Sequence, residues 1–301
     1  MNHVLITGAS GFLGKYIVDA FTQQNWYVST VGRHSSNSIQ CDLAVDVPDL
    51  SNINANLVIH AMGKAHMVPS TDAEAQAFFD VNFEGTKRLC SALEHAAALP
   101  EQFVFISTVA VYGKDEGAGI NEDHPLQGKT PYALSKIQAE QWLQQWCDHN
   151  NIRLSMLRLP LVAGRNAPGN LGAMVNGIRT GRYFNISEGK ARKSVVLAED
   201  VANWIPKIAA VGGVYNLTDG FHPSFAELAT VIAKQLHCNP PGNLPSWVAL
   251  PAAFAGNFLG SRAPINCDKL RKITATLTFN DAKAKAAFGW MPKPVLESAL
   301  V

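Results

Sequence analysis

The stretch from Thr7 to Gly14, Thr-Gly-Ala-Ser-Gly-Phe-Leu-Gly, constrains the fold more than any other part of the sequence. It lies between a short apolar run at 4–6, typical of a β-strand, and an amphipathic helical pattern at 16–21, and a second strand pattern follows at 27–31. Glycines at this spacing allow a tight turn, close approach of backbone N–H groups to a pyrophosphate, and close packing of helix on strand. The segment therefore predicts a dinucleotide-binding βαβ unit, with a glycine turn that binds no ligand as the alternative. The loop residues expected to contact the dinucleotide are Gly8, Ser10, Gly11, Phe12, Leu13 and Gly14.

The end of the second predicted strand indicates which dinucleotide fits. NAD sites usually place a carboxylate there for the ribose 2′-hydroxyl, whereas NADP sites place an arginine near the 2′-phosphate. Here the strand is followed by Arg33, with Ser35 and Ser36 close behind and no carboxylate. Arg33 therefore favours NADP(H), with NAD and a solvated loop arginine as the alternatives.

Further predicted strands would bring more side chains to the same edge of a parallel sheet. A third strand closes at 40–43, where Asp42 and Leu43 would lie near the adenine, and a fully buried fourth strand spans 56–60. A fifth strand at 103–106 leads into Thr108, whose hydroxyl would hydrogen-bond a substrate oxygen at the crevice where open α/β sheets bind ligands. A sixth strand spans 152–159. The residues Ala61, Met62 and Gly63 follow the fourth strand and are also predicted beside the cofactor.

Tyr132 and Lys136 lie four residues apart at the predicted start of a helix that runs to about Asp148. Residues i and i+4 share one face of a helix, so Lys136 would hold its charge near the phenol of Tyr132. A nearby cation lowers the pKa of a phenol from about 10, which would make Tyr132 a usable acid and base. The pair alone also occurs by chance in many helices.

Composition is that of an ordinary enzyme, with a net charge of +1 that calls for neither nucleic acid nor an acidic membrane. The five cysteines are scattered without a disulfide framework or metal-ligand spacing, so we expect reduced thiols and no metal. Without a signal peptide before the first strand, we expect a cytoplasmic protein with no membrane insertion. The apolar window from Trp247 to Leu259 is too short to span a bilayer and predicts a buried helix, with an interfacial or lid role as the alternative.

Together these stretches resemble the extended short-chain dehydrogenase/reductase superfamily, in its NAD-dependent epimerase/dehydratase (nucleotide-sugar) branch, over essentially the whole chain. The matching motifs are Thr7-Gly8-x-x-Gly11-x-x-Gly14, Asp42, His60-Ala61, Asn82-x-x-Gly85-Thr86, Ser107-Thr108, Val111-Tyr112-Gly113, Tyr132-x-x-x-Lys136, Leu157-Arg158-x-Pro160, Gly164, Asp200-Val201 and Phe288-Gly-Trp-x-Pro292. The resemblance implies that Tyr132 exchanges a proton with a sugar hydroxyl or ketone, that Thr108 fixes that oxygen, and that Lys136 holds the nicotinamide ribose. It also implies that Asn82 and Pro160 lie beside the cofactor.

The resemblance also implies an α/β fold: a Rossmann-type doubly wound parallel sheet with a smaller, interleaved C-terminal substrate-binding domain. Glycines and prolines interrupt the regular pattern beyond Pro160, so we place the domain switch there. The NAD(P)-binding domain would comprise residues 1–164 and about 193–212, with the segment at 195–197 returning to the sheet. The smaller domain would comprise 165–192 and 213–301. A homodimer through the helices after Asp72 and Tyr132 is a further expectation.

Departures from the family pattern narrow the expected reaction. Dehydratases of this branch carry an Asp-Glu pair after the hydroxyl residue, but Val109 and Ala110 follow Thr108 here; typical epimerases carry a histidine that is missing from the stretch before Asp200. We therefore expect a reductase of UDP-4-keto sugars in surface-polysaccharide synthesis. The alternatives are a nucleotide-sugar 4-epimerase, a reductase of a non-sugar ketone and a non-catalytic NADP sensor. The side chains expected to hold the substrate, besides Thr108, are Arg165, Asn170 and Arg192.

Overall fold

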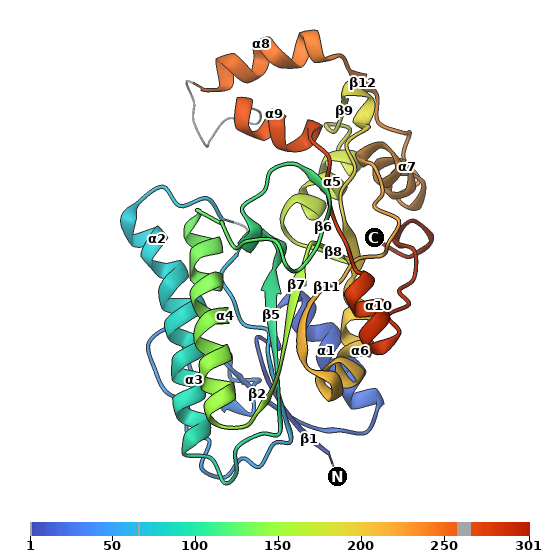
Figure 1. Cartoon of the computed structure of the whole chain (residues 1–301). Helices are drawn as coiled ribbons and strands as arrows, with labels where there is room; N and C mark the ends of the chain where they lie inside the picture. Colours follow the sequence, from blue (N-terminus) through green and yellow to red (C-terminus); the bar gives the residue numbers. More distant parts are fainter. Residues whose placement is uncertain (1, 66, 258–265) are drawn as a thin grey trace.

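A seven-stranded, fully parallel sheet forms the centre of the computed structural model, which describes residues 2–65, 67–257 and 266–301 (Figure 1). Its strand order is β11-β7-β5-β4-β1-β2-β3. The strands are β1 (His3–Thr7), β2 (Tyr27–Gly32), β3 (Ile39–Gln40), β4 (Leu57–His60), β5 (Gln102–Thr108), β7 (Arg153–Leu159) and β11 (Gly213–Asn216). From β1 the chain adds strands first on one side and then, from β4, on the other. The carboxyl ends of β1 and β4 therefore flank the point at which an open α/β sheet binds its ligand.

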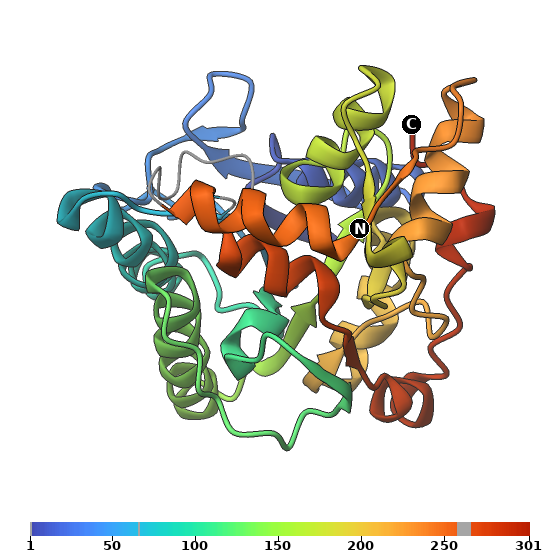
Figure 2. The same cartoon turned by 90° about the horizontal axis from the view of Figure 1, so that it is seen from above.

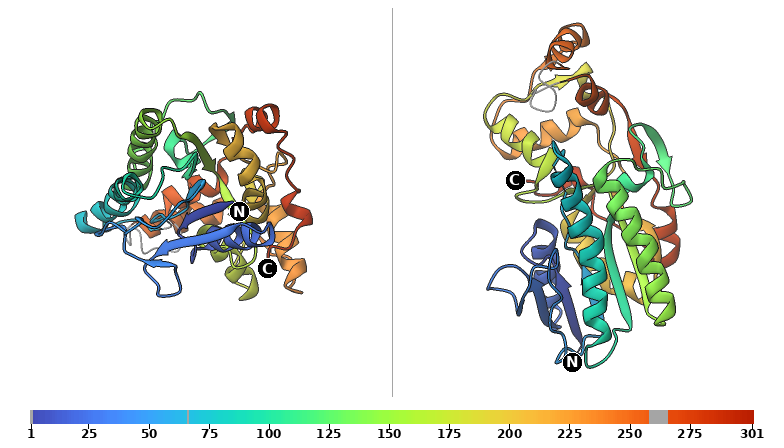
Figure 3. Two further views of the ribbon diagram at one scale, coloured as in Figure 1. Left: turned by 90° about the horizontal axis from the view of Figure 1, so that it is seen from below. Right: turned by 90° about the vertical axis from the view of Figure 1, so that its left-hand side faces the viewer.

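Helices cover both faces of this sheet, because alternate residues of its strands are apolar on both sides. Val4 and Ile6 of β1 pack in one core with α1 and α6, whereas Leu5 belongs to the core beneath α3 and α4. The right-hand view of Figure 3 shows α2 and α3 running end to end as one long helix, with α4 beside it, over that second face. The helices of the two layers are α1 (Phe12–Gln23), α6 (Ala198–Val211) and α10 (Ala282–Phe288) on the first face, and α2 (Asp72–Phe79), the π-helical turn Asp80–Glu84, α3 (Gly85–Glu94) and α4 (Pro131–His149) on the second.

Three two-stranded parallel sheets build the remainder of the structure. β8 (Leu161–Ala163) pairs with β10 (Val195–Leu197), β9 (Asn185–Ile186) with β12 (Asn243–Leu244), and β6 (Gly117–Ile120) with β13 (Leu277–Phe279). The helices of this part are α5 (Gly169–Arg179), α7 (Phe225–Gln235), α8 (Ser246–Asn257) and α9 (Cys267–Thr274), and short 3-10 turns lie at Val109–Tyr112, Ser187–Gly189 and Val295–Glu297. Leu171 and Ile178 of α5 pack with Leu228 and Ile232 of α7 to give this part its own core.

The expected α/β fold with its doubly wound parallel sheet is confirmed, but two expected boundaries change. The segment at 195–197 is β10, which pairs with β8 and not with the large sheet. Residues 213–216 form β11, an edge strand of the large sheet paired with β7, so they belong with the sheet and not with the smaller domain. The third strand ends at Gln40, so Asp42 and Leu43 lie in the turn after it.

The prediction that residues 247–259 form a buried helix is wrong. Within this segment, α8 leaves 76% of Trp247 and 62% of Phe254 exposed, while residues 258 and 259 lie outside the described part of the chain. α8 packs against α9 at the end of the molecule opposite the N-terminus, as Figures 1 and 2 agree. In the described part of the chain, every helix is too short or too polar to cross a membrane.

Candidate active site

The glycine loop connects β1 to α1 and is packed too tightly for side chains. Gly8 adopts a φ of +73°, and a Cβ there would lie 2.6 Å from the backbone N of Met62. A Cβ on Gly14 would overlap the Gly8 carbonyl oxygen. Gly11 caps α1 without a side chain, so the first N–H groups of the helix face the space beside the loop. This geometry suits a pyrophosphate, which supports the roles predicted for the loop residues.

Tyr132 and Thr108 meet at the carboxyl end of the sheet. Thr108 is the last residue of β5, and Tyr132 lies in the first turn of α4, which Thr130 begins by accepting a hydrogen bond from the N–H of Ala133 at 3.2 Å. Thr108 accepts from the N–H of Ala110 at 3.2 Å, and its hydroxyl lies beside the phenol of Tyr132. Burial raises the pKa of Tyr132 above its ordinary value of 10, and the Thr108 hydroxyl offsets only part of that effect. Tyr132 is therefore protonated at neutral pH.

Lys136 differs from its expected geometry. Its ammonium donates to the carbonyl of Ile106 at 2.9 Å and lies 4.3 Å from the centre of the Phe105 ring. Burial lowers the pKa of Lys136 to about 8, against a smaller opposite effect of Glu140. The expectation that Lys136 lowers the pKa of Tyr132 is therefore wrong for the protein without cofactor, because the lysine is directed to the β5 backbone. The ammonium nevertheless lies close to Gly63, on the loop after β4.

The loop after β4 is held in place by Asn82. Its Oδ1 accepts from the N–H of Lys64 at 2.7 Å, and its Nδ2 donates to the Lys64 carbonyl and to Ser135. Ser135 donates in turn to the carbonyl of Tyr132. Asn82 was predicted beside the cofactor, and its contacts show that it joins this loop to the Tyr132 helix through Ser135, a residue that the sequence reading missed.

The remaining predicted cofactor residues lie on both sides of the glycine loop. Arg33 is exposed at the end of β2, which runs parallel to β1, and Ala61 and Met62 abut Gly8. Asp42 accepts from the N–H of Ala44 at 3.1 Å within the turn after β3. Leu43 has its side chain in the core, and Pro160 lies between β7 and β8.

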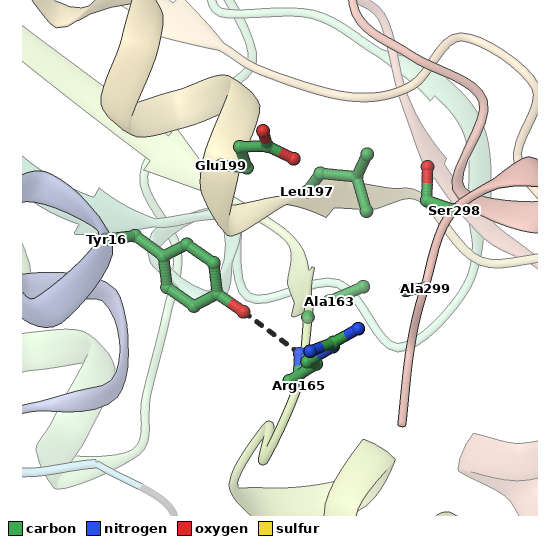
Figure 4. Close-up of a pocket in the computed structure, with 8 residues that line it drawn as sticks. Tyr16, Ala163, Arg165, Leu197, Glu199, Ser298 and Ala299 are labelled. Atoms are coloured by element: carbon green, nitrogen blue, oxygen red, sulfur yellow. Dashed lines mark hydrogen bonds between the residues drawn. The ribbon is translucent and has the colours of Figure 1, made fainter. Parts of the chain in front are cut away.

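The predicted substrate residues lie apart from one another. Arg165 donates its backbone N–H to Tyr16 of α1 and lines a cavity of about 250 Å³ with Glu199, as Figure 4 shows. Arg192 donates to the carbonyl of His222 at 2.9 Å and lies 3.5 Å from Glu227. Asn170 is exposed in the first turn of α5. Their roles toward a substrate stay predictions.

A buried polar network fixes the strand that carries Thr108. Glu140 of α4 accepts from Ser107 and pairs with Arg158 of β7 at 2.7 Å. Arg158 also donates to Tyr112 at 3.2 Å, and Tyr112 donates to Asn216 of β11 at 2.8 Å. Glu140 was missed in the sequence, although it lies one helical turn after Lys136 on the same face of α4.

Comparisons with known proteins agree with this geometry. Residues 4–217 match the model of the "NAD dependent epimerase/dehydratase family". A UDP-glucose 4-epimerase of Vibrio cholerae is 25% identical over 98% of this chain and 92% of its own length, and a GDP-6-deoxy-D-mannose reductase of Pseudomonas aeruginosa is 26% identical over 76% and 79%. The structure of a UDP-glucose 4-epimerase with UDP-glucose from Thermotoga maritima superposes with a TM-score of 0.76 at 18% identity, covering 98% of this chain and 95% of that one.

Proposed function

This chain belongs to the NAD dependent epimerase/dehydratase family, and we propose that it reduces a UDP-activated 4-keto sugar with a hydride from NADPH. The observation that carries the proposal is the pairing of Tyr132 with Thr108 at the sheet edge that also holds the glycine loop. A bound nicotinamide would supply the hydride to the carbonyl carbon. The protein would supply the proton and the position of the carbonyl oxygen.

The proton would come from Tyr132. Reduction of a ketone requires a protonated group beside the carbonyl oxygen, and the raised pKa of Tyr132 keeps its phenol protonated at neutral pH. Thr108 would donate a second hydrogen bond to the same oxygen and so fix its direction. Lys136, beside Gly63, would turn from the Ile106 carbonyl to the ribose hydroxyls when the cofactor binds.

The residues next to Thr108 disfavour dehydration of a sugar substrate. Val109 and Ala110 form the start of a 3-10 turn there, and neither side chain can act as an acid or a base. Removing water from a sugar needs both. A plain carbonyl–alcohol step remains the reaction that these side chains support.

The choice of NADPH rests on Arg33. Its position at the end of β2, beside the strand that leads into the glycine loop, suits a guanidinium contact with a 2′-phosphate. The following stretch supplies the hydroxyls of Ser35 and Ser36. Exchange of Arg33 for Asp should therefore shift preference from NADPH toward NADH.

A second candidate, a nucleotide-sugar 4-epimerase, is favoured by the similarity to the Vibrio cholerae enzyme over nearly the whole chain. An epimerase would use the same Tyr132 first as a base and then as an acid.

For either reaction we propose that residues 165–192 and the part after β11 bind the substrate, and that a homodimer forms through α2, α3 and α4.

Cofactor balance on a UDP-4-keto sugar separates the two candidates. The reductase proposal expects one NADPH oxidised per sugar reduced, followed by absorbance and by mass spectrometry of the sugar. Inversion of a UDP-hexose without net cofactor use would contradict the reductase proposal and support the epimerase. Tyr132→Phe should lower kcat about 10²- to 10⁴-fold in either case, whereas the matched control Tyr27→Phe, at an exposed ring, should not.

A further inference from the structure

Helix α8 buries two of its alanines and exposes its largest side chains. Ala249 and Ala253 are completely buried against Leu270 of α9 and its neighbours, whereas Trp247 and Phe254 are among the most exposed apolar side chains of the structure. A surface helix of a globular protein ordinarily does the opposite, with its large apolar residues toward the core. The packing of α8 is thus complete without these rings.

The exposed large residues share one side of the helix. Trp247, Leu250 and Phe254 are spaced by three and four residues, which places them one above the other; we call them the apolar face of α8. Leu250 is 46% exposed. Phe184, 53% exposed, lies beside Gly242 just before the strand that leads into α8. Figures 1 and 2 place α8 on the outside of the molecule, with α9 between it and the rest.

Charge is divided unevenly over the chain. Residues 165–193 and 213–301 hold fourteen Lys and Arg against six Asp and Glu, whereas the rest of the chain holds eleven against eighteen. Between Lys234 and Arg262 the sequence has no Asp, Glu, Lys or Arg, so the uncharged helix α8 lies within a basic part of the protein. On α9, which packs against α8, Arg271 and Lys272 are more than half exposed, and Asp115 pairs with Arg271 at 2.7 Å and lies 3.9 Å from Lys272.

We propose that the apolar face of α8 docks the protein onto a bilayer that contains anionic phospholipids. Tryptophan and phenylalanine side chains are well suited to the boundary between headgroups and acyl chains, and nearby cations add attraction to anionic headgroups. Docking requires no bilayer-spanning segment, because only side chains on one side of α8 enter the boundary. A second copy of this chain suits the face less well, since a symmetric contact through α8 would bring together two copies of the same basic part of the protein. The proposal does not depend on the reaction catalysed.

The test uses the full chain and sedimentation with lipid vesicles. Wild type should sediment with vesicles of phosphatidylcholine and phosphatidylglycerol, and binding should weaken with pure phosphatidylcholine or added salt. Trp247→Gln and Phe254→Gln should each lower the partition coefficient about tenfold, since each removes one ring from the boundary. The matched control Met291→Gln, at a side chain that is 78% exposed away from α8, should leave binding unchanged.

Two further readouts decide the outcome. The emission of Trp247 should shift to shorter wavelength with vesicles, and Trp247→Phe should lack that shift. Equal binding of wild type and the Trp247→Gln/Phe254→Gln double variant would overturn the proposal, as would binding indifferent to lipid charge. The proposal would also be overturned if wild type does not bind vesicles and forms a dimer that the folded double variant does not form. That result would assign the apolar face of α8 to self-association. Thermal melting of each variant establishes that it is folded.

Discussion

The buried ammonium of Lys136 should destabilise the protein without cofactor, so Lys136→Met should stabilise it. Lys136 is only 4% exposed, and burial lowers its pKa from 10.5 to about 8. A difference of about 2.5 pKa units corresponds to about 3 kcal/mol of unfolding free energy at neutral pH. Methionine also leaves the Ile106 carbonyl without this donor, which costs about 1 kcal/mol. The net gain should be about 2 kcal/mol at pH 7, while catalysis is lost.

The sign of the pH dependence makes this prediction specific. Below pH 8 the lysine is charged in both folded and unfolded protein, so the full penalty is present. Between pH 8 and 10.5 the unfolded chain still binds the proton that the folded protein has lost, so wild type gains stability as pH rises. The advantage of Lys136→Met should therefore shrink through this window and reverse near its upper end.

Urea unfolding of both proteins without cofactor, followed by tryptophan fluorescence from pH 7 to 10.5, measures the difference. Lys129→Met, at an exposed lysine just before the same helix, is the matched control and should give a small difference that is constant with pH. A Lys136→Met variant that is less stable than wild type at pH 7, or a difference that does not change with pH, would refute the reasoning.

Three further predictions concern the loop and the buried polar groups. Gly14→Ala should abolish NADPH binding measured by fluorescence titration, whereas Gly242→Ala, with room for a Cβ, should bind normally. Arg158→Met should lower the unfolding free energy by about 3–5 kcal/mol, because it leaves the buried Glu140 carboxylate unpaired. Adding Glu140→Leu should recover most of this loss. A double variant as unstable as Arg158→Met alone would contradict that cause. Burial lowers the pKa of His60 to about 3, so stability should fall by up to about 1.4 kcal/mol per unit as pH drops from 6.5 toward 3. His60→Gln should show a smaller loss of unfolding free energy per pH unit in acid unfolding than wild type. If the variant loses stability with pH as steeply as wild type, His60 is not the cause.

Local signals allowed much of the fold and site to be predicted. The glycine loop is specified by residues adjacent in sequence, and the Tyr132 helix begins at Thr130 and Pro131, a cap and a first-turn proline that read directly from the sequence. The pairing of β10 with β8 could not be predicted in this way, because the sequence of a short apolar strand does not specify which parallel strand it pairs with.

The target of Lys136 and the exposure of α8 were missed for related reasons. Helical spacing places Lys136 on the face of Tyr132, but a long side chain can reach the strand behind it, and only the packed structure identifies the Ile106 carbonyl. An apolar run indicates burial without saying which side is buried. In α8 the alanines fit against α9, so the rings face outward.

The pairing of β6 with β13 has a consequence for synthesis of the protein. β6 lies in the connection between Thr108 and Tyr132, yet its partner strand ends at Phe279. As the ribosome releases the chain from the N-terminus, the first six strands of the large sheet can associate before that partner exists. The connection between the two catalytic candidates gains its partner only after residue 279 has been synthesised, so a nascent chain would have the core of the large sheet before it had a complete site.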